Sequence, residues 1–149
     1  MQQNDIIRID VPAKFRYLNM IGSSIRAILE RIDEFSIAPE TIYNLQLAVH
    51  EVCNNIIEHA YGHEQGQIQI VVTIEWEEQR FLIDLYDTGT AFDPTSVADP
   101  DLSKPQVKGY GLFLARQLLD DLRYETTNDE TTNDETTNAQ NHWRLVKRL

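Results

Sequence analysis

Hydrophobic residues recur at intervals of three and four in three stretches of the chain, a spacing typical of helices that bury one face. These stretches are residues 17–35, 39–62 and 112–119. The middle one is the most regular, and its apolar stripe consists of Ile42, Leu45, Val49, Val52 and Ile56. Pro39 suits the first turn of a helix and Gly62 suits its end, so we expect one continuous helix between them.

A second pattern, alternation of apolar and polar residues with β-branched runs, predicts five strands. They are expected at residues 6–11, 67–76, 80–87, 123–125 and 142–147. The short link between the second and third favours an antiparallel hairpin, and the last two form a closing pair. This order of elements predicts an α+β fold, a two-layer sandwich with helices on one face of a mixed, largely antiparallel sheet.

Two segments lack hydrophobic periodicity. Thr88 to Lys108 contains three prolines, and a loop of this length inside a compact domain is usually functional or disordered. Residues 126–140 repeat the sequence Thr-Thr-Asn-Asp-Glu, which we interpret as a solvated, mobile insertion at a hairpin tip, with a binding tail as the alternative. We expect one domain over residues 1–149.

The composition narrows the class of function. Lys and Arg number 13 against 24 Asp and Glu, a net charge of −11, and no basic stripe is present, so direct nucleic-acid binding is not expected. The acidic balance fits solubility or attraction to a basic partner. The single Cys53 is interpreted as a small core residue in a reducing cytoplasm. No apolar run is long enough to span a membrane, and we expect a cytoplasmic protein.

Polar residues form a line on the middle helix. Glu51 and Asn55 are four apart and therefore project from neighbouring turns of one face. A carboxylate and an amide placed together can hold a nucleophilic hydroxyl and a hydrated cation. A solvated helix face is the ordinary alternative for such a pair.

Two glycine motifs lie downstream of this helix. Asp87-Thr88-Gly89 follows a strand, where the carboxylate can accept a hydrogen bond from the exocyclic amino group of adenine and the glycine allows close backbone approach. Lys108-Gly109-Tyr110-Gly111 precedes a helix, whose free N–H groups favour phosphate. Either motif alone is also a common turn sequence, and neither is a Walker loop or a dinucleotide fingerprint.

The three motifs together, in this order, resemble the N, G1 and G2 boxes of the GHKL ATPase superfamily, which has the Bergerat fold. Within it the chain is similar to the anti-sigma-factor serine/threonine kinases of bacterial partner-switching systems. Phe92-Asp93-Pro94 and Gly111-Leu112-Phe113-Leu114 carry the likeness to this subgroup. The resemblance extends from about Ile6 to the last strand, apart from the repeat.

The resemblance implies a role for each motif residue. Glu51 would be the general base and Asn55 would coordinate the Mg²⁺ that bridges the phosphates of ATP. Asp87 would bind the adenine amino group and Gly89 would shape its pocket. Residues 88–108 would be the ATP lid, and the phosphate-binding residues would be Lys108, Gly109 and Gly111. Whether Lys104 or Lys108 contacts the γ-phosphate is left open.

The implied partners are proteins: a sigma factor and an anti-anti-sigma antagonist that is phosphorylated on serine or threonine. A homodimer is compatible with the resemblance, although no interface shows in the periodicity. The principal alternative is a catalytically silent module that binds ATP and sequesters a sigma factor or antagonist. A third option is a phosphatase-linked regulator or a domain cut from a larger sensor, and the complete-looking first and last strands argue against a fragment. A metal site at His59 and His63 lacks a third ligand.

Overall fold

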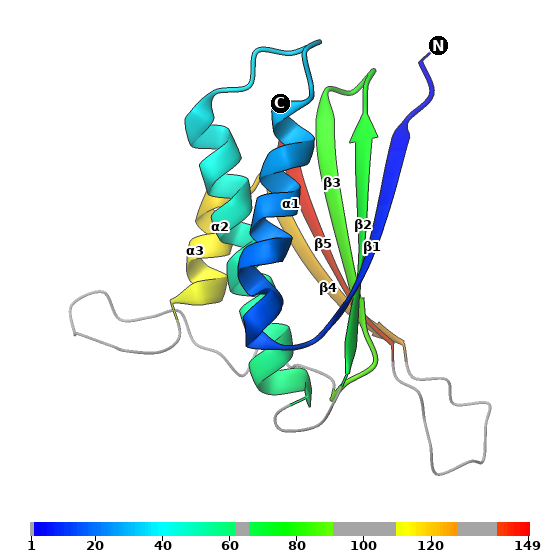
Figure 1. Cartoon of the computed structure of the whole chain (residues 1–149), viewed down its shortest axis with the longest axis vertical. Coiled ribbons are helices and arrows are strands. Elements are labelled where there is room, and N and C mark those ends of the chain that lie inside the picture. The colour runs from blue at the N-terminus through cyan, green and yellow to red at the C-terminus, as the bar shows by residue number, and fades with distance from the viewer. Residues whose placement is uncertain (1, 62–65, 91–109, 128–139) are drawn as a thin grey trace.

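The computed structural model describes residues 2–61, 66–90, 110–127 and 140–149, and the elements of these ranges form two layers (Figure 1). The strands are β1 (Asp5–Pro12), β2 (Gln67–Glu75), β3 (Arg80–Asp87), β4 (Asp121–Thr127) and β5 (Gln140–Arg148). The helices are α1 (Leu18–Glu30), α2 (Pro39–Asn55) and α3 (Gly111–Leu118), with a 3₁₀ turn η1 (Phe15–Tyr17) and a π-helical turn η2 (Ile56–Tyr61).

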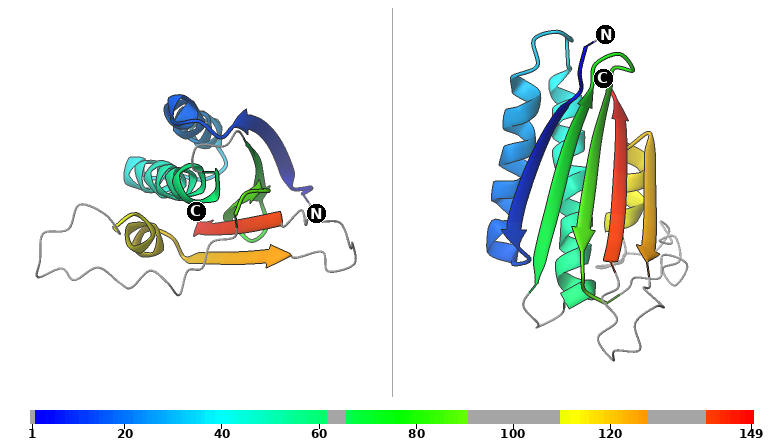
Figure 2. Two further views of the ribbon diagram at one scale, coloured as in Figure 1. Left: turned by 90° about the horizontal axis from the view of Figure 1, so that it is seen from below. Right: turned by 90° about the vertical axis from the view of Figure 1, so that its right-hand side faces the viewer.

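The five described strands form one sheet in the order β1-β2-β3-β5-β4. Each of the four neighbouring pairs is antiparallel. The three described helices cover the same face of this sheet, and within the described ranges no helix lies on the other face (Figure 2). The predicted α+β sandwich is therefore confirmed, and its sheet is antiparallel at every described pairing.

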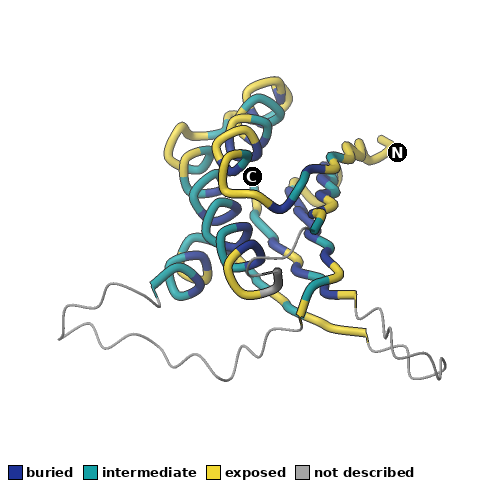
Figure 3. The backbone as a smooth tube through the Cα atoms, turned by 60° about the horizontal axis from the view of Figure 1, so that its bottom comes forward, coloured by how far each residue is buried: buried dark blue, intermediate teal, exposed yellow. Residues whose placement is uncertain are grey.

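Helix α2 lies between α1 and α3 and contacts both of them (Figure 2). Its predicted stripe faces the sheet, and Leu45, Val49, Val52 and Ile56 are at most 2% exposed. Buried residues gather between the helices and the sheet, as expected for a single core (Figure 3). Cys53 belongs to this core, and burial raises the pKa of its thiol to about 12, which makes it a packing residue rather than a nucleophile.

The helix boundaries differ from the prediction in two places. The first helix ends at Glu30 rather than at residue 35, although Ile32 and Phe35 after it still pack on the core. The middle helix is α-helical only to Asn55 and then continues as the π-helical turn η2. Within this widened turn Ile56 and Ile57 are both buried, and they continue the apolar stripe of α2 at the same spacing of three and four. The predicted end at Gly62 lies outside the described residues.

The repeat connects β4 to β5, and its first two residues belong to β4. Thr126 pairs with Asn141 and Thr127 pairs with Gln140. These β-branched threonines suit a strand, which is why β4 extends beyond the expected residue 125. Residues 128–139 lie outside the described part of the chain.

Candidate functional site

The start of α3 packs directly on the polar face of α2. A methyl group built on Gly111 would come within 2.5 Å of Glu51 Oε2 and within 3.8 Å of Asn55 Nδ2. Only glycine therefore fits here without displacing the Glu51 carboxylate. Two motifs that are more than fifty residues apart in the sequence thus meet, and they bring the start of a helix, whose first N–H groups have no partner within the helix, close to a carboxylate and an amide.

Asp87, the last residue of β3, is buried on the helix-covered face of the sheet and is only 3% exposed. Its Oδ1 accepts hydrogen bonds from the backbone N–H of Gly89 at 3.0 Å and from Asn141 Nδ2 at 2.8 Å. Gly89 thus turns the chain back onto the carboxylate. Both hydrogen bonds that the carboxylate receives from the described part of the chain end on Oδ1, so Oδ2 can receive a donor from a ligand.

Burial raises the pKa of the Asp87 carboxyl, and the hydrogen bonds from Asn141 and Gly89 oppose this rise by stabilising the charged form. A buried carboxylate with one oxygen held by two donors is suited to bind a ligand through the other oxygen. The natural ligand group is a neutral hydrogen-bond donor such as an exocyclic amine.

Asn141 is the site residue that the sequence reading missed. It lies opposite Asp87 in the β3–β5 register, is 1% exposed, and accepts a hydrogen bond from the Tyr124 hydroxyl at 2.9 Å. The ring of Tyr124 in turn packs on Trp143, with centroids 4.5 Å apart. The signal was hidden because Asn141 directly follows the low-complexity repeat, where no strand was expected.

These groups share one hollow between α2, η2 and the ends of β3, β4 and β5. Its lining consists of Asn55, Ile56, His59, Asp87, Thr90, Tyr124, Asn141 and Trp143. The predicted site residues Asn55 and Asp87 therefore line the same hollow. Glu51 does not line it, but Gly111 lies close to both Glu51 and Asn55. The predicted phosphate-binding residues Lys108 and Gly109, and the lid beyond Thr90, lie outside the described residues.

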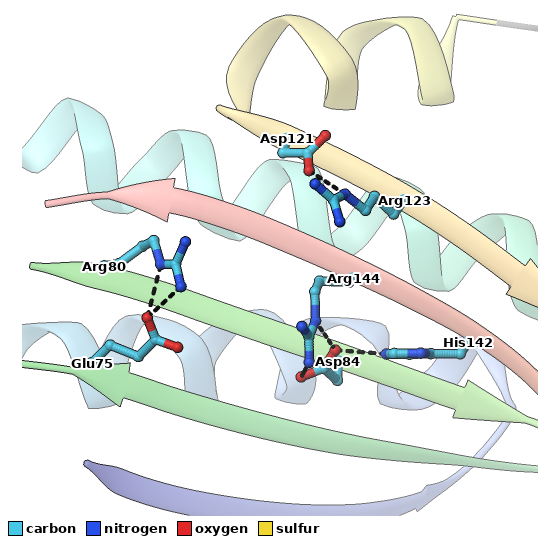
Figure 4. Close-up of polar contacts among 7 residues, drawn as sticks. All are labelled: Glu75, Arg80, Asp84, Asp121, Arg123, His142 and Arg144. Carbon is cyan, nitrogen blue, oxygen red and sulfur yellow. Dashed lines mark hydrogen bonds and ion pairs between the residues drawn. The ribbon is translucent and has the colours of Figure 1, made fainter. Parts of the chain in front are cut away.

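A second buried carboxylate, Asp84, does not belong to this hollow. It projects from the helix-free face of β3, where His142 Nε2 lies 2.6 Å and Arg144 Nε 2.7 Å from its Oδ1 (Figure 4). Its neighbours on this face include the pairs Glu75–Arg80 and Asp121–Arg123. Because consecutive strand residues alternate between faces, Asp84 and Asp87 serve different surfaces, and Asp84 stabilises the sheet.

Two further expectations concern a metal site and membrane-spanning helices. Within the described ranges, no group of three or more His, Cys, Asp or Glu side chains is arranged to hold a metal ion, and His63 lies outside them. The helices described here include none that is long and apolar enough to cross a membrane.

Comparison with known proteins defines the class. The histidine kinase-like ATPase domain family matches residues 11–134, and the chain belongs to this family. Among its relatives is the serine-protein kinase RsbW of Bacillus cereus strain AH820, which is 31% identical over 131 residues, 83% of this chain and 79% of that protein. The RsbW proteins of Bacillus anthracis and of Bacillus thuringiensis strain Al Hakam match to the same extent.

A solved structure with this arrangement contains the RsbU and RsbW domains of a Mycobacterium tuberculosis protein. It matches with a TM-score of 0.60 and 17% identity, over 97% of this chain and 32% of that one. At this identity the similarity concerns the fold, and the fold is the predicted one.

Proposed function

We propose that this protein is an ATP-dependent serine/threonine kinase that acts as an anti-sigma factor, and that it phosphorylates an anti-anti-sigma antagonist in a partner-switching system. The observation that carries the proposal is the meeting of Gly111 with Glu51 and Asn55 at the edge of a hollow that ends on Asp87. The RsbW relatives, which are named as serine-protein kinases, support the same reaction.

Each part of the site has a task in phosphoryl transfer, which depends on positioning and charge neutralisation. The adenine amino group donates to Asp87 Oδ2, and the phosphates lie toward the N–H groups at the start of α3. Glu51 accepts the proton of the antagonist's hydroxyl group while the oxygen of that hydroxyl bonds to the γ-phosphorus. The bond from this phosphorus to the bridging oxygen breaks, and ADP leaves.

The donor set near α3 fits Mg²⁺. Asn55 lies one helical turn after Glu51 and carries an amide oxygen, and Mg²⁺ typically takes only one or two protein ligands together with phosphate oxygens and water. When bound, the ion would neutralise charge on the phosphates. We assign Asn55 as its protein ligand.

The second candidate is a silent module that binds ATP and sequesters a sigma factor. The location of Glu51 favours the kinase, because nucleotide binding alone needs no carboxylate beside the phosphate-binding helix start. We also propose that the protein works in the cytoplasm, where ATP and sigma factors are found. A homodimer stays a prediction.

The two candidates are separated by transfer of γ-labelled phosphate from ATP to a purified anti-anti-sigma protein of the same organism. We expect the wild-type protein to label a serine or threonine, and Glu51→Gln to label it at least about 100-fold more slowly with ATP affinity nearly unchanged. Glu58→Gln is the matched control, since Glu58 is an exposed acid on the adjoining turn. ATP binding without transfer would favour the silent module, and a fully active Glu51→Gln variant would remove Glu51 as the base.

A further inference from the structure

A chain of hydrogen bonds leads from β4 through β5 to the carboxylate that ends β3. The Tyr124 hydroxyl donates to Asn141 Oδ1 at 2.9 Å, and Asn141 Nδ2 donates to Asp87 Oδ1 at 2.8 Å and to the Gly89 carbonyl at 3.0 Å. All three side chains line the hollow. Asn141 and Asp87 are nearly inaccessible, at 1% and 3% exposure, so these hydrogen bonds belong to the wall of the hollow and not to the protein surface.

The orientation of the Asn141 amide is determined by its neighbours. Its nitrogen faces two groups that only accept hydrogen bonds, the Asp87 carboxylate and the Gly89 carbonyl. A flipped amide would place oxygen against both acceptors, which is strongly unfavourable in a buried site. On the other side of the amide, the Tyr124 hydroxyl donates to the Asn141 oxygen and so satisfies the acceptor that this orientation presents to it.

This orientation has a consequence for the ligand. With Oδ1 occupied by donors from Asn141 and Gly89, Asp87 presents its other oxygen as a fixed acceptor. An acceptor binds the 6-amino group of adenine and repels the 6-oxo group of guanine or hypoxanthine. A 6-oxo purine would leave this buried oxygen of Asp87 without a donor, and sites that leave a polar group unpaired in this way discriminate strongly against such a ligand.

We propose that Asn141, held in place by the hydrogen bond from Tyr124, is a positioning residue that sets the preference of this site for 6-amino over 6-oxo purine nucleotides. The inference rests on the proposed ATP-binding function and extends it to two residues outside the three sequence motifs. Asn141 acts through Asp87, so its removal changes the base preference and not only the stability of the fold.

The test compares the affinities of the full chain for ATP and for inosine triphosphate, which carries a 6-oxo group but lacks the 2-amino group of guanine. Tyr124→Phe removes one hydroxyl and keeps the ring that packs on Trp143. We expect it to lower the ATP-to-ITP affinity ratio about 3- to 10-fold, as the loss of one hydrogen bond predicts. Asn141→Asp places a second acceptor against Asp87 and should weaken ATP binding by more than about 30-fold.

The matched control is Thr127→Val, which removes the hydroxyl that donates to the Gln140 carbonyl on the same pair of strands, outside the hollow. It should leave the ratio unchanged. If the wild type prefers ATP and Tyr124→Phe keeps the full ratio, the positioning role is overturned while the ATP site stands. If Asn141→Asp does not fold, Tyr124→Phe decides. If the wild type binds neither nucleotide, the proposed function and this inference both fail.

Discussion

At the scale of single residues, Gly111 decides how closely α3 can approach the polar face of α2. Gly111→Ala would push the added methyl group against Glu51 Oε2, 2.5 Å away, so the carboxylate must move. We expect phosphoryl transfer to fall at least about tenfold, because a displaced base loses part of the 10²–10⁴-fold that such groups contribute. The unfolding free energy should change by less than about 1 kcal/mol, since a flexible side chain can yield and alanine is a better helix former.

Gly22→Ala is the matched control for this variant. Gly22 lies at the α1–α2 contact, where a new methyl group would be 3.1 Å from Gln46 Cγ, and it lies outside the hollow. The Gly22→Ala variant should transfer phosphate to the antagonist at the wild-type rate. A Gly111→Ala variant with the wild-type rate would show that Glu51 does not need its present location.

Asp87 offers a separate test through the pH dependence of stability. Because burial raises its pKa in the folded state, the folded state holds the proton more tightly than the unfolded state does. The contribution of this group to stability is therefore full below its unfolded pKa of about 4, and it is lost as the pH rises through the higher folded pKa. Asparagine does not titrate, so Asp87→Asn should not lose stability in this way. As the pH rises from the unfolded pKa through the folded pKa, the variant should become more stable relative to the wild type.

The measurement is denaturant unfolding of both proteins at a series of pH values, combined with ATP titration at neutral pH. The asparagine can still accept from Asn141 and Gly89 through its oxygen, so the local fold should persist while ATP binding weakens more than about tenfold. Equal ATP affinity in the two proteins would remove Asp87 from the nucleotide site. Parallel stability curves would contradict the raised pKa.

At the scale of elements, the pairing of Thr127 with Gln140 sets the geometry of the β4–β5 hairpin. Replacing residues 128–139 by Asn-Gly would leave a two-residue connection of the type that joins antiparallel strands. We expect this variant to keep the wild-type far-UV circular dichroism and ATP affinity. A melting temperature that rises slightly would agree with the shorter loop, whereas loss of ATP binding would assign the repeat a role in the site.

The elements also differ in how well the sequence predicts them. The stripe of α2 and the strand alternation followed from side-chain periodicity, and all three helices and five strands were anticipated. The π-helical turn after Asn55 was not, because Ile56 and Ile57 continue the same apolar stripe and their spacing gives no sign of a widened turn. The length of β4 was underestimated because its last threonines look like the start of a polar repeat.

At the scale of the whole molecule, motif order predicted which residues would meet, but not how they are held. Glu51 and Gly111 were each expected in the site, yet their direct contact depends on the packing of α3 on α2. Asn141 could not be found from local sequence, since its role comes from the register that places it opposite Asp87. Pairing between distant strands is a tertiary property, and periodicity along one segment does not contain it.

The central claim is that α2, the end of β3 and the start of α3 form one adenine-nucleotide site. The most direct test is calorimetric titration of ATP into the purified full chain with Mg²⁺, repeated with GTP and without the metal. We predict binding in the micromolar range for ATP with Mg²⁺, much weaker binding of GTP, and weaker binding of ATP once Mg²⁺ is removed. Equal affinity for ATP and GTP would contradict the assignment of Asp87, and no binding of either would contradict the site itself.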